Sequence, residues 1–209
     1  MSKYITLFVG VSVVISLWYI AGYKKNIKLM KFISEALERA LKPKDKLYTY
    51  LGGVLGFAVD YTVDGFKKVH ATLRLIPRQS ALYLPFMFIT SGKDSLQIMF
   101  YTKKPIESEF HIIKEGFLKF TKPKIYNREK LKSRYETING VKYEILFEDD
   151  KYDRFVEFVK LFNPKHFNHL AITKDNSIVY VNLLFYGMKP QELENSIKKA
   201  ANFIRTFNS

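Results

Sequence analysis

The sequence predicts an α+β protein in which a single N-terminal transmembrane helix precedes a cytoplasmic domain with a largely antiparallel sheet and packed helices. Three observations predict this fold class. Residues 5–23 are uncharged over the length that a bilayer-spanning helix needs. Later segments alternate apolar and polar residues around turn signals such as Asn139-Gly140, as antiparallel hairpins do. Helical spacing returns at 152–162 and 190–207, without a regular βαβ order.

The first element is the apolar segment, and we expect residues 1–23 to form a membrane anchor. Aromatic rings favour the headgroup layer, and they gather at the C-terminal end of the segment as Trp18, Tyr19 and Tyr23. Basic residues follow directly as Lys24, Lys25, Lys28 and Lys31. Because such residues collect on the cytoplasmic side of a span, the pattern predicts a single pass with the N-terminus outside and the C-terminal domain in the cytoplasm.

A cleaved signal peptide is the alternative for this segment. Only Lys3 precedes the apolar run, the run is long for a signal sequence, and the basic cluster comes after it. A retained anchor is therefore expected. Small residues within the span would let a partner helix or a client approach closely, and these are Gly10, Ser12 and Ser16.

The next element is a basic amphipathic helix, expected over 24–45. Pro43 and Asp45 end the helical pattern. Before them, the apolar residues that recur at helical spacing are Met30, Ile33, Leu37 and Leu41. Packing of this stripe on the following domain is favoured over lipid binding. Both interpretations leave the lysines of the helix free to face lipid or RNA.

Residues 46–209 contain no repeat and no linker rich in Gly or Ser, so they are interpreted as one domain. Alternation on both sides of Asp64-Gly65 predicts two antiparallel strands within 55–76. The remaining elements are strands at 95–103 and 108–115, hairpins at 135–148 and 169–185, and helices at 152–162 and 190–207.

Composition limits the function. The chain has 34 Lys and Arg against 20 Asp and Glu, and the net charge of +14 favours an anionic neighbour such as RNA or a lipid headgroup surface. With no cysteine there is no disulfide framework, thiolate metal site or cysteine nucleophile. The common nucleotide-binding, serine hydrolase and zinc protease motifs are also missing, so no catalytic residue, metal or cofactor is predicted.

Two clusters with potential chemistry have simpler explanations. His166 and His169 have a spacing that can place two imidazoles on one helical face, but their neighbours look like the start of a strand and no third ligand lies nearby. An acidic group lies between an expected strand and helix, where carboxylates cap the helix and complement its dipole. This group is Glu148, Asp149, Asp150 and Asp153.

The segment from Leu73 to Leu82 contains a Leu-Arg-x-x-x-Arg-Gln-x-x-Leu pattern, which ends the second strand and opens a hydrophobic stretch. Around it come the single span, the exit "GYKKN", the strand "SLQIMFY", the run "ILFEDDKYDRFVEFVKLFNPKHFNHLAI" and the end "VYVNLLFYGMKPQELENSIKKAANFIRTF". In this order the features resemble the calumin family, whose best-known member is the coiled-coil-domain-containing subunit of the PAT complex in the multipass translocon. The resemblance covers nearly the whole chain.

The resemblance implies a noncatalytic accessory factor of the translocon, an intramembrane chaperone that assists insertion and folding of multi-spanning proteins. Its implied partners are the protein-conducting channel, an Oxa-type insertase, a small membrane protein, and nascent membrane proteins as clients. The eukaryotic protein also has an acidic segment before its span, implicated in calcium binding, and a basic coiled coil near the ribosome at its end. This chain starts at the span and ends at Ser209, so calcium binding is not expected and ribosome contact is less supported. The resemblance therefore implies a minimal member of the family, expected to be archaeal. Its location would be the cell membrane in an archaeon and the endoplasmic reticulum membrane in a eukaryote.

Basic residues are the candidates for contact with ribosomal RNA or with anionic lipid, because phosphates attract Lys and Arg in both. For the run at 128–134, a solvated surface explains the charges equally well. The candidates are Lys24, Lys25, Lys28, Lys31, Arg74, Arg78, Lys122, Lys124, Arg128, Lys130, Lys132 and Arg134.

The uncharged stretch "SALYLPFMFITSG" at 80–92 is too short to cross a bilayer. We expect Leu82 and Phe86 to pack inward. Complete burial of the stretch is the alternative. The side chains expected to face lipid, a partner or a client are Tyr83, Met87, Phe88 and Ile89.

Three functions are therefore compared. The first is the translocon accessory factor. The second is a membrane-tethered domain that binds or transfers lipid, which needs an apolar cavity. The third is a membrane-bound enzyme, which needs polar groups that converge in a pocket.

Overall fold

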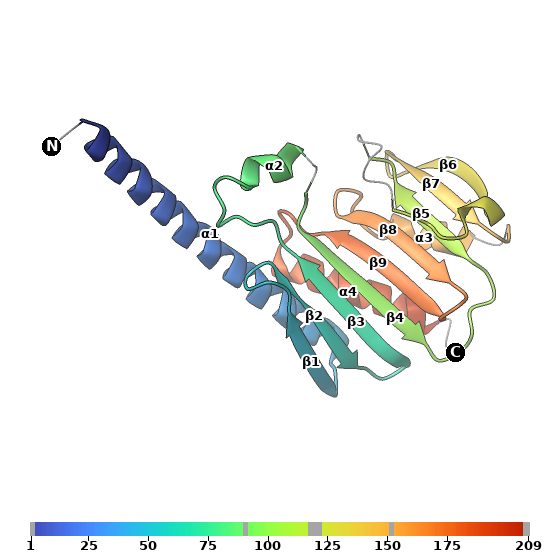
Figure 1. Cartoon of the computed structure of the whole chain (residues 1–209). Helices are drawn as coiled ribbons and strands as arrows, with labels where there is room; N and C mark the ends of the chain where they lie inside the picture. The colour runs from blue at the N-terminus through green and yellow to red at the C-terminus, as the bar shows by residue number, and fades with distance from the viewer. Residues whose placement is uncertain (1–2, 90–91, 117–122, 151–152, 207–209) are drawn as a thin grey trace.

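A long N-terminal helix and a nine-stranded antiparallel sheet dominate the computed structural model, which describes residues 3–89, 92–116, 123–150 and 153–206 (Figure 1). The strand order is β1-β2-β3-β4-β9-β8-β5-β7-β6. The strands are β1 (Asp45–Tyr50), β2 (Gly56–Thr62), β3 (Phe66–Arg74), β4 (Ser95–Thr102), β5 (Phe110–Lys114), β6 (Lys132–Ile138), β7 (Val141–Phe147), β8 (Phe167–Thr173) and β9 (Ile178–Leu184). The helices are α1 (Lys3–Leu41), α2 (Leu84–Ile89), the 3-10 turn η2 (Arg128–Lys130), α3 (Asp153–Lys160) and α4 (Pro190–Arg205). The predicted α+β class is confirmed.

One face of the sheet forms the core with the helices. Along β3, Val69, Ala71 and Leu73 are fully buried, because alternate side chains of a strand point to the same face. The C-terminal half of α1 and the whole of α4 cover this face, and α4 lies behind the sheet in Figure 1. The aromatic ring of Phe158 on α3 stacks on Phe203 of α4, with centroids 4.0 Å apart.

The expected anchor and the expected amphipathic helix form one continuous helix, α1. Its apolar stripe packs on the domain as predicted, since Met30, Ile33, Leu37 and Leu41 are buried. The helix ends at Leu41, short of the predicted 45, because Lys42 adopts a positive φ of 48° and Pro43 follows.

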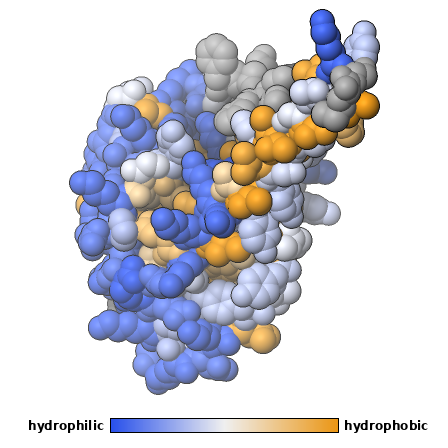
Figure 2. Space-filling view, turned by 90° about the vertical axis from the view of Figure 1, so that its left-hand side faces the viewer, coloured by the Kyte–Doolittle hydropathy of each residue, from blue (hydrophilic) through white to orange (hydrophobic). Residues whose placement is uncertain are grey.

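The N-terminal half of α1 projects away from the domain (Figure 1), and its large apolar side chains are exposed from Tyr4 to Ile20. Within the described residues, α1 is the one helix long and apolar enough to cross a membrane. This composition supports membrane anchoring. Figure 2 views the molecule from the side where α1 projects and shows apolar surface along this helix, with hydrophilic side chains over most of the domain beside it.

The strand predictions agree with the structure except at the start of the domain. The hairpins across Asp64-Gly65, Asn139-Gly140 and Asp175-Asn176 are all present as β2–β3, β6–β7 and β8–β9. The edge strand β1 was not predicted. All but one of its residues are exposed, so "DKLYTY" shows little of the alternation between apolar and polar residues that marks a half-buried strand.

Candidate functional site

Helix α1 is fixed to the domain where it leaves the apolar segment. The indole Nε1 of Trp18 donates a hydrogen bond to the carbonyl of Arg78 at 2.9 Å. One turn later, the Arg78 carbonyl lies against Gly22, in the space that a Cβ atom would occupy. A further turn on, the buried amide of Asn26 donates to the carbonyls of Val54 at 3.1 Å and Ile76 at 2.9 Å. The orientation of the domain relative to the apolar helix is therefore set by specific contacts.

A buried ion pair lies behind this joint. Arg78 and Asp94 pair through both guanidinium nitrogens, and their side chains are 12% and 5% exposed. The same guanidinium donates to the side-chain oxygen of Asn26 at 3.0 Å, and Asp94 accepts from the Ile76 N–H at 2.9 Å. The prediction that Arg78 contacts RNA or headgroups is corrected here, because its donors are directed to partners within the chain.

Two pockets flank α1, one at this level and one further along the helix. We call the first the α2-side pocket; its volume is about 890 Å³. It lies between α1, the segment that contains α2, and the strand ends of β8 and β9. Its lining residues are Trp18, Ala21, Gly22, Lys25, Ile76, Arg78, Leu84, Gly92, Lys93, Asp94, Lys165, His166, Leu184 and Tyr186.

The α2-side pocket combines apolar walls with cations. Lys25, Lys93 and Lys165 are exposed, and among the ion pairs of the described residues none joins these three to a carboxylate. Asp94, the acid in the lining, is already balanced by Arg78. The pocket therefore carries a net positive charge.

Lys114 adds to this charge from just outside the lining. Its ammonium donates to the carbonyl of Pro164 at 2.6 Å, directly before Lys165. Burial lowers the pKa of Lys114, and the charge of Lys93 lowers it further. The two ammonium groups are thus close enough to repel each other.

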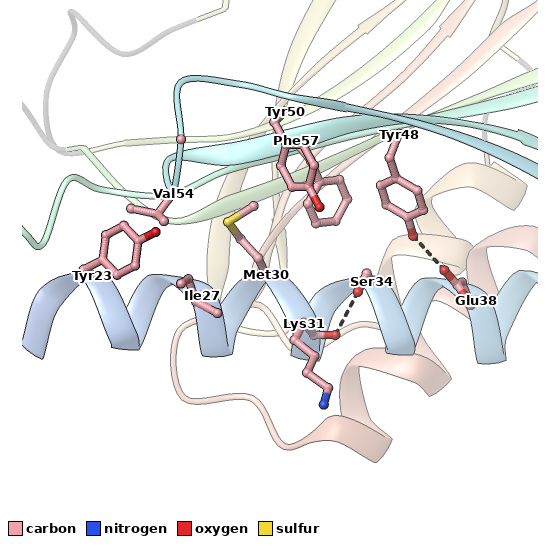
Figure 3. Close-up of a pocket in the computed structure, with 11 residues that line it drawn as sticks. Tyr23, Ile27, Met30, Lys31, Ser34, Glu38, Tyr48, Tyr50, Val54 and Phe57 are labelled. Carbon is pink, nitrogen blue, oxygen red and sulfur yellow. Dashed lines mark hydrogen bonds between the residues drawn. The ribbon is translucent and has the colours of Figure 1, made fainter. Parts of the chain in front are cut away.

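We call the second cavity the β1-side pocket; it lies between α1 and the β1–β2 hairpin and has a volume of about 540 Å³ (Figure 3). Met30 points from α1 toward Phe57, while Lys31 points away from the cavity (Figure 3), and Ile27 and Val54 are also in the lining. Further lining residues are Tyr23, Ser34, Glu38, Tyr48, Tyr50 and Gly53.

The polar groups of the β1-side pocket are bound to each other. The Tyr48 hydroxyl donates to Glu38 at 2.9 Å and lies 2.6 Å from the Tyr61 hydroxyl. Glu38 also accepts from Lys46 at 2.8 Å, and this bond lowers the pKa of the Glu38 carboxyl. Burial raises the pKa of Tyr61 to about 12, so the tyrosines stay neutral. This pocket offers aromatic and apolar walls without an unpaired cation directed inward.

The α2 segment corrects one sequence prediction. Leu82 and Phe86, expected to pack inward, are 91% and 66% exposed. Leu82 lies before the helix, which begins at Leu84, and Phe86 lies on a side of this six-residue helix that does not face the domain. Tyr83 is exposed as predicted and Met87 is half-buried. The side chains of Phe88 and Ile89 lie outside the described part of the structure.

The predicted basic residues do not form one surface. Lys24, Lys25, Lys28 and Lys31 are exposed on α1, and Arg74 is exposed at the end of β3. The run at 128–134 lies around β6, at the sheet edge opposite β1. Within this run Arg128 pairs with Glu144, Lys132 with Asp150 and Arg134 with Glu136, whereas Lys130, like the preceding Lys124, is exposed. Lys122 lies outside the described residues.

The small residues of the apolar helix also divide into two faces. An α-helix turns by about 100° per residue, so Gly10 lies on a different face from Ser12 and Ser16. The two serine hydroxyls donate to the carbonyls of Phe8 and Ser12, at 2.9 and 2.8 Å.

The histidines and the acidic group are placed apart. His169 stacks on His111 within the sheet, and burial lowers the pKa of His169 to about 3. His166 lies instead at the α2-side pocket, where its Nδ1 is 2.8 Å from the carbonyl oxygen of Leu184. In the described ranges, no group of three or more His, Asp or Glu is arranged to hold a metal. Asp153 lies in the first turn of α3, while Glu148 and Asp150 pair with Lys174 and Lys132.

Sequence reasoning missed the residues that distinguish the α2-side pocket. Lys93, Lys114 and Lys165 are isolated single lysines in "GKD", "IKE" and "PKH". Only the pairing of β5 with β8, and the loop before β4, bring them together. No spacing along the chain marks them.

Comparisons with known proteins leave the family open. No family model and no curated protein matches the chain. Among solved structures it is similar to the mycobacterial trehalose monomycolate transport factor A, TtfA, with 10% identity and a TM-score of 0.33. The similarity covers 78% of this chain and 72% of that one, and at this TM-score it carries no argument about function.

Proposed function

We propose that this protein is a noncatalytic, membrane-anchored domain that binds a lipid taken from the adjacent leaflet. The observation that carries the proposal is the α2-side pocket, an apolar-walled cavity at the point where the exposed apolar part of α1 ends. Its volume of about 890 Å³ falls within the range of small-molecule sites, roughly 300–1,000 Å³.

The position of the pocket relative to the bilayer supports this function. Trp18 belongs both to the aromatic end of the apolar helix and to the pocket lining, and indole rings favour the headgroup layer. With Trp18 in the headgroup layer, its bond to Arg78 and the close contact at Gly22 would put the pocket at the level of the headgroups. The exposed Leu82 and Phe86 would enter the interface on the same side.

The lysines after the apolar segment support a cytoplasmic domain with the N-terminus outside, so the leaflet concerned is the cytoplasmic one. The proposal includes no reaction. Arg78 and Asp94, the buried acid and base of the pocket wall, bind each other and α1, which is a structural use of both groups.

The test is retention of lipid by the full-length chain, purified in mild detergent and examined by native mass spectrometry. Ala21→Trp places a large ring in the pocket, while Ile20→Trp puts the same ring next to it on a helix face outside the lining. We expect a lipid adduct on the wild type and on Ile20→Trp, and its loss on Ala21→Trp. An adduct of equal intensity on all three proteins, or none on the wild type, would refute the proposed function.

The second candidate function is the translocon accessory role, and one observation favours it. Leu82, Tyr83 and Phe86 form an apolar surface beside the apolar helix, suitable for contact with a client segment or a partner helix. The channel, an insertase of the Oxa type, and the ribosome are partners in this proposal, the last through the exposed lysines of α1.

Photocrosslinking in native membranes tests this second function. A photoreactive residue at Phe86 should capture channel, insertase or nascent-chain segments, whereas one at the exposed Tyr126, near η2, should not. Capture of lipid alone at Phe86 would refute the accessory role and leave the lipid-binding proposal standing.

A further inference from the structure

We infer that the α2-side pocket selects an anionic phospholipid, with the phosphate held between Lys93 and Lys165 and an acyl chain along Trp18, Leu84 and Leu184. The inference rests on the proposed function and adds the chemical class of the ligand. It is carried by three features of the pocket: its uncompensated charge, the convergence of cations from separate elements, and its continuity with apolar walls.

The charge of the pocket favours an anion. Lys93 and Lys165 have no carboxylate partner among the described residues, and Asp94 is balanced by Arg78. A phosphate diester would supply the missing negative charge, and hydrogen bonds in which both groups are charged are stronger than neutral ones.

The cations come from two separate places in the fold. Lys93 lies in the loop before β4 and Lys165 in the turn before β8. Lys114, on the neighbouring β5, donates to the Pro164 carbonyl and so holds the turn that contains Lys165. Its pKa is lowered first by burial and then by the positive charge of Lys93, so Lys93 and Lys114 repel each other. An anion bound between these groups would remove that repulsion.

The apolar walls determine what carries the anion. Ile76, Leu84 and Leu184 line the same cavity as the lysines, and α1 contributes Trp18 and Ala21. A soluble phosphate would leave this apolar surface exposed, whereas a phospholipid covers it with an acyl chain. Because Trp18 and Ala21 of the apolar part of α1 line the pocket, an acyl chain could pass from the bilayer into it along this helix.

The experiment compares two lipids with identical acyl chains, phosphatidylglycerol and phosphatidylcholine, offered together to the full-length protein in detergent. Native mass spectrometry gives the ratio of the two adducts. Free inorganic phosphate is a third arm, because a site that recognises phosphate alone would lose its lipid adduct in competition. We expect a marked excess of phosphatidylglycerol that inorganic phosphate does not displace.

The variants assign this preference to the pocket. A basic residue next to an anionic lipid surface contributes about 1 kcal/mol, which is about fivefold in affinity. Lys93→Gln and Lys165→Gln should therefore each lower the ratio about fivefold, while phosphatidylcholine binding is unchanged. Lys24→Gln and Lys28→Gln, on exposed parts of α1 outside the lining, are the matched controls and should leave the ratio unchanged.

The outcomes separate the inference from the proposed function. Equal binding of both lipids by the wild type would overturn the anionic selection while lipid binding still holds. An equal fall in the ratio for the α1 controls would overturn it too, because general surface charge would then explain the preference. Failure of either lipid to bind would overturn the proposed function itself.

Discussion

The two pockets beside α1 lie one after the other along the same helix, and they differ in how their polar groups are used. In the β1-side pocket, Glu38, Tyr48 and Tyr61 are bound to each other, and Lys31 points away (Figure 3). In the α2-side pocket the buried Arg78 and Asp94 form the wall, and lysines at the rim stay without carboxylates. Cavity volume alone therefore does not distinguish the two pockets, whereas the unpaired positive charge at the rim of the α2-side pocket does.

The pockets also differ in how firmly they are built. The wall of the α2-side pocket contains Arg78 and Asp94, and the hydrogen bonds of Asn26 with Ile76 and Arg78 connect α1 to the loop after β3. The β1-side pocket is closed by an edge strand, β1, in which Leu47 and Tyr50 are about 70% exposed (69% and 71%). Substitutions in the first should therefore cost more stability than those in the second.

The largest effect is expected for Arg78→Ala. Removing one partner of a buried ion pair leaves Asp94 charged and without its counterion, at a cost of about 3–5 kcal/mol. For a chain of this size, that corresponds to a fall in Tm of roughly 10 °C. Circular dichroism of the full-length protein in detergent measures it. Arg74→Ala, an exposed arginine four residues earlier, is the control, and an equal Tm for the two variants would contradict the role assigned to Arg78.

The next effect is expected at the close contact of α1 with the loop. Gly22→Ala puts a methyl group into the position of the Arg78 carbonyl, and such overpacking costs about 1–3 kcal/mol. The helix itself would favour alanine over glycine by about 1 kcal/mol, so the expected loss has the opposite sign to helix propensity.

Gly10→Ala is the matched control for this contact, since no atom outside the helix lies within 4 Å of the added methyl group. Thermal melting of both variants, together with hydrogen exchange in the 75–79 loop, measures the effect. If Gly22→Ala were as stable as Gly10→Ala and its loop as protected, the fixed joint between helix and domain would be wrong.

The general architecture could be predicted because its signals are local. The apolar run before Lys24, the turn at Asn139-Gly140 and the helical spacing after Pro190 each depend on neighbours in sequence. The exposed β1 gave no such signal, because a strand held at an edge by its main chain does not need buried side chains.

The pocket could not be predicted because its residues meet only through the fold. Arg78 looked like a surface cation beside Gln79, and its true partner, Asp94, lies 16 residues away across the α2 segment. Leu82 and Phe86 are apolar and expected in the core, but an uncharged stretch does not indicate which of its side chains face the domain. The translocon role rests on the order of features along the chain, and it stays a proposal.

The smallest expected effect lies in the β1-side pocket and depends on pH. Lys46 lowers the pKa of Glu38 below its value of 4.5 in an unfolded chain. The unfolded state therefore binds the proton more readily, so Glu38 contributes its stability above about pH 4.5 and loses it as the pH falls through the folded-state pKa. The side chains of Glu38 and Lys46 are 33% and 50% exposed, so their ion pair contributes only about 0.2–1 kcal/mol to the free energy of unfolding.

The Glu38→Gln variant isolates this contribution. Its Tm should lie slightly below that of the wild type at pH 7, and the two should converge as the pH falls below the folded-state pKa of Glu38, since the protonated acid and the amide are similar. The control is Glu157→Gln on the exposed side of α3, where Glu157 pairs with Lys160 of the same helix. A difference at pH 7 as large as that of Arg78→Ala would reverse the comparison, because the β1-side pocket would then depend on its polar groups as strongly as the α2-side pocket does.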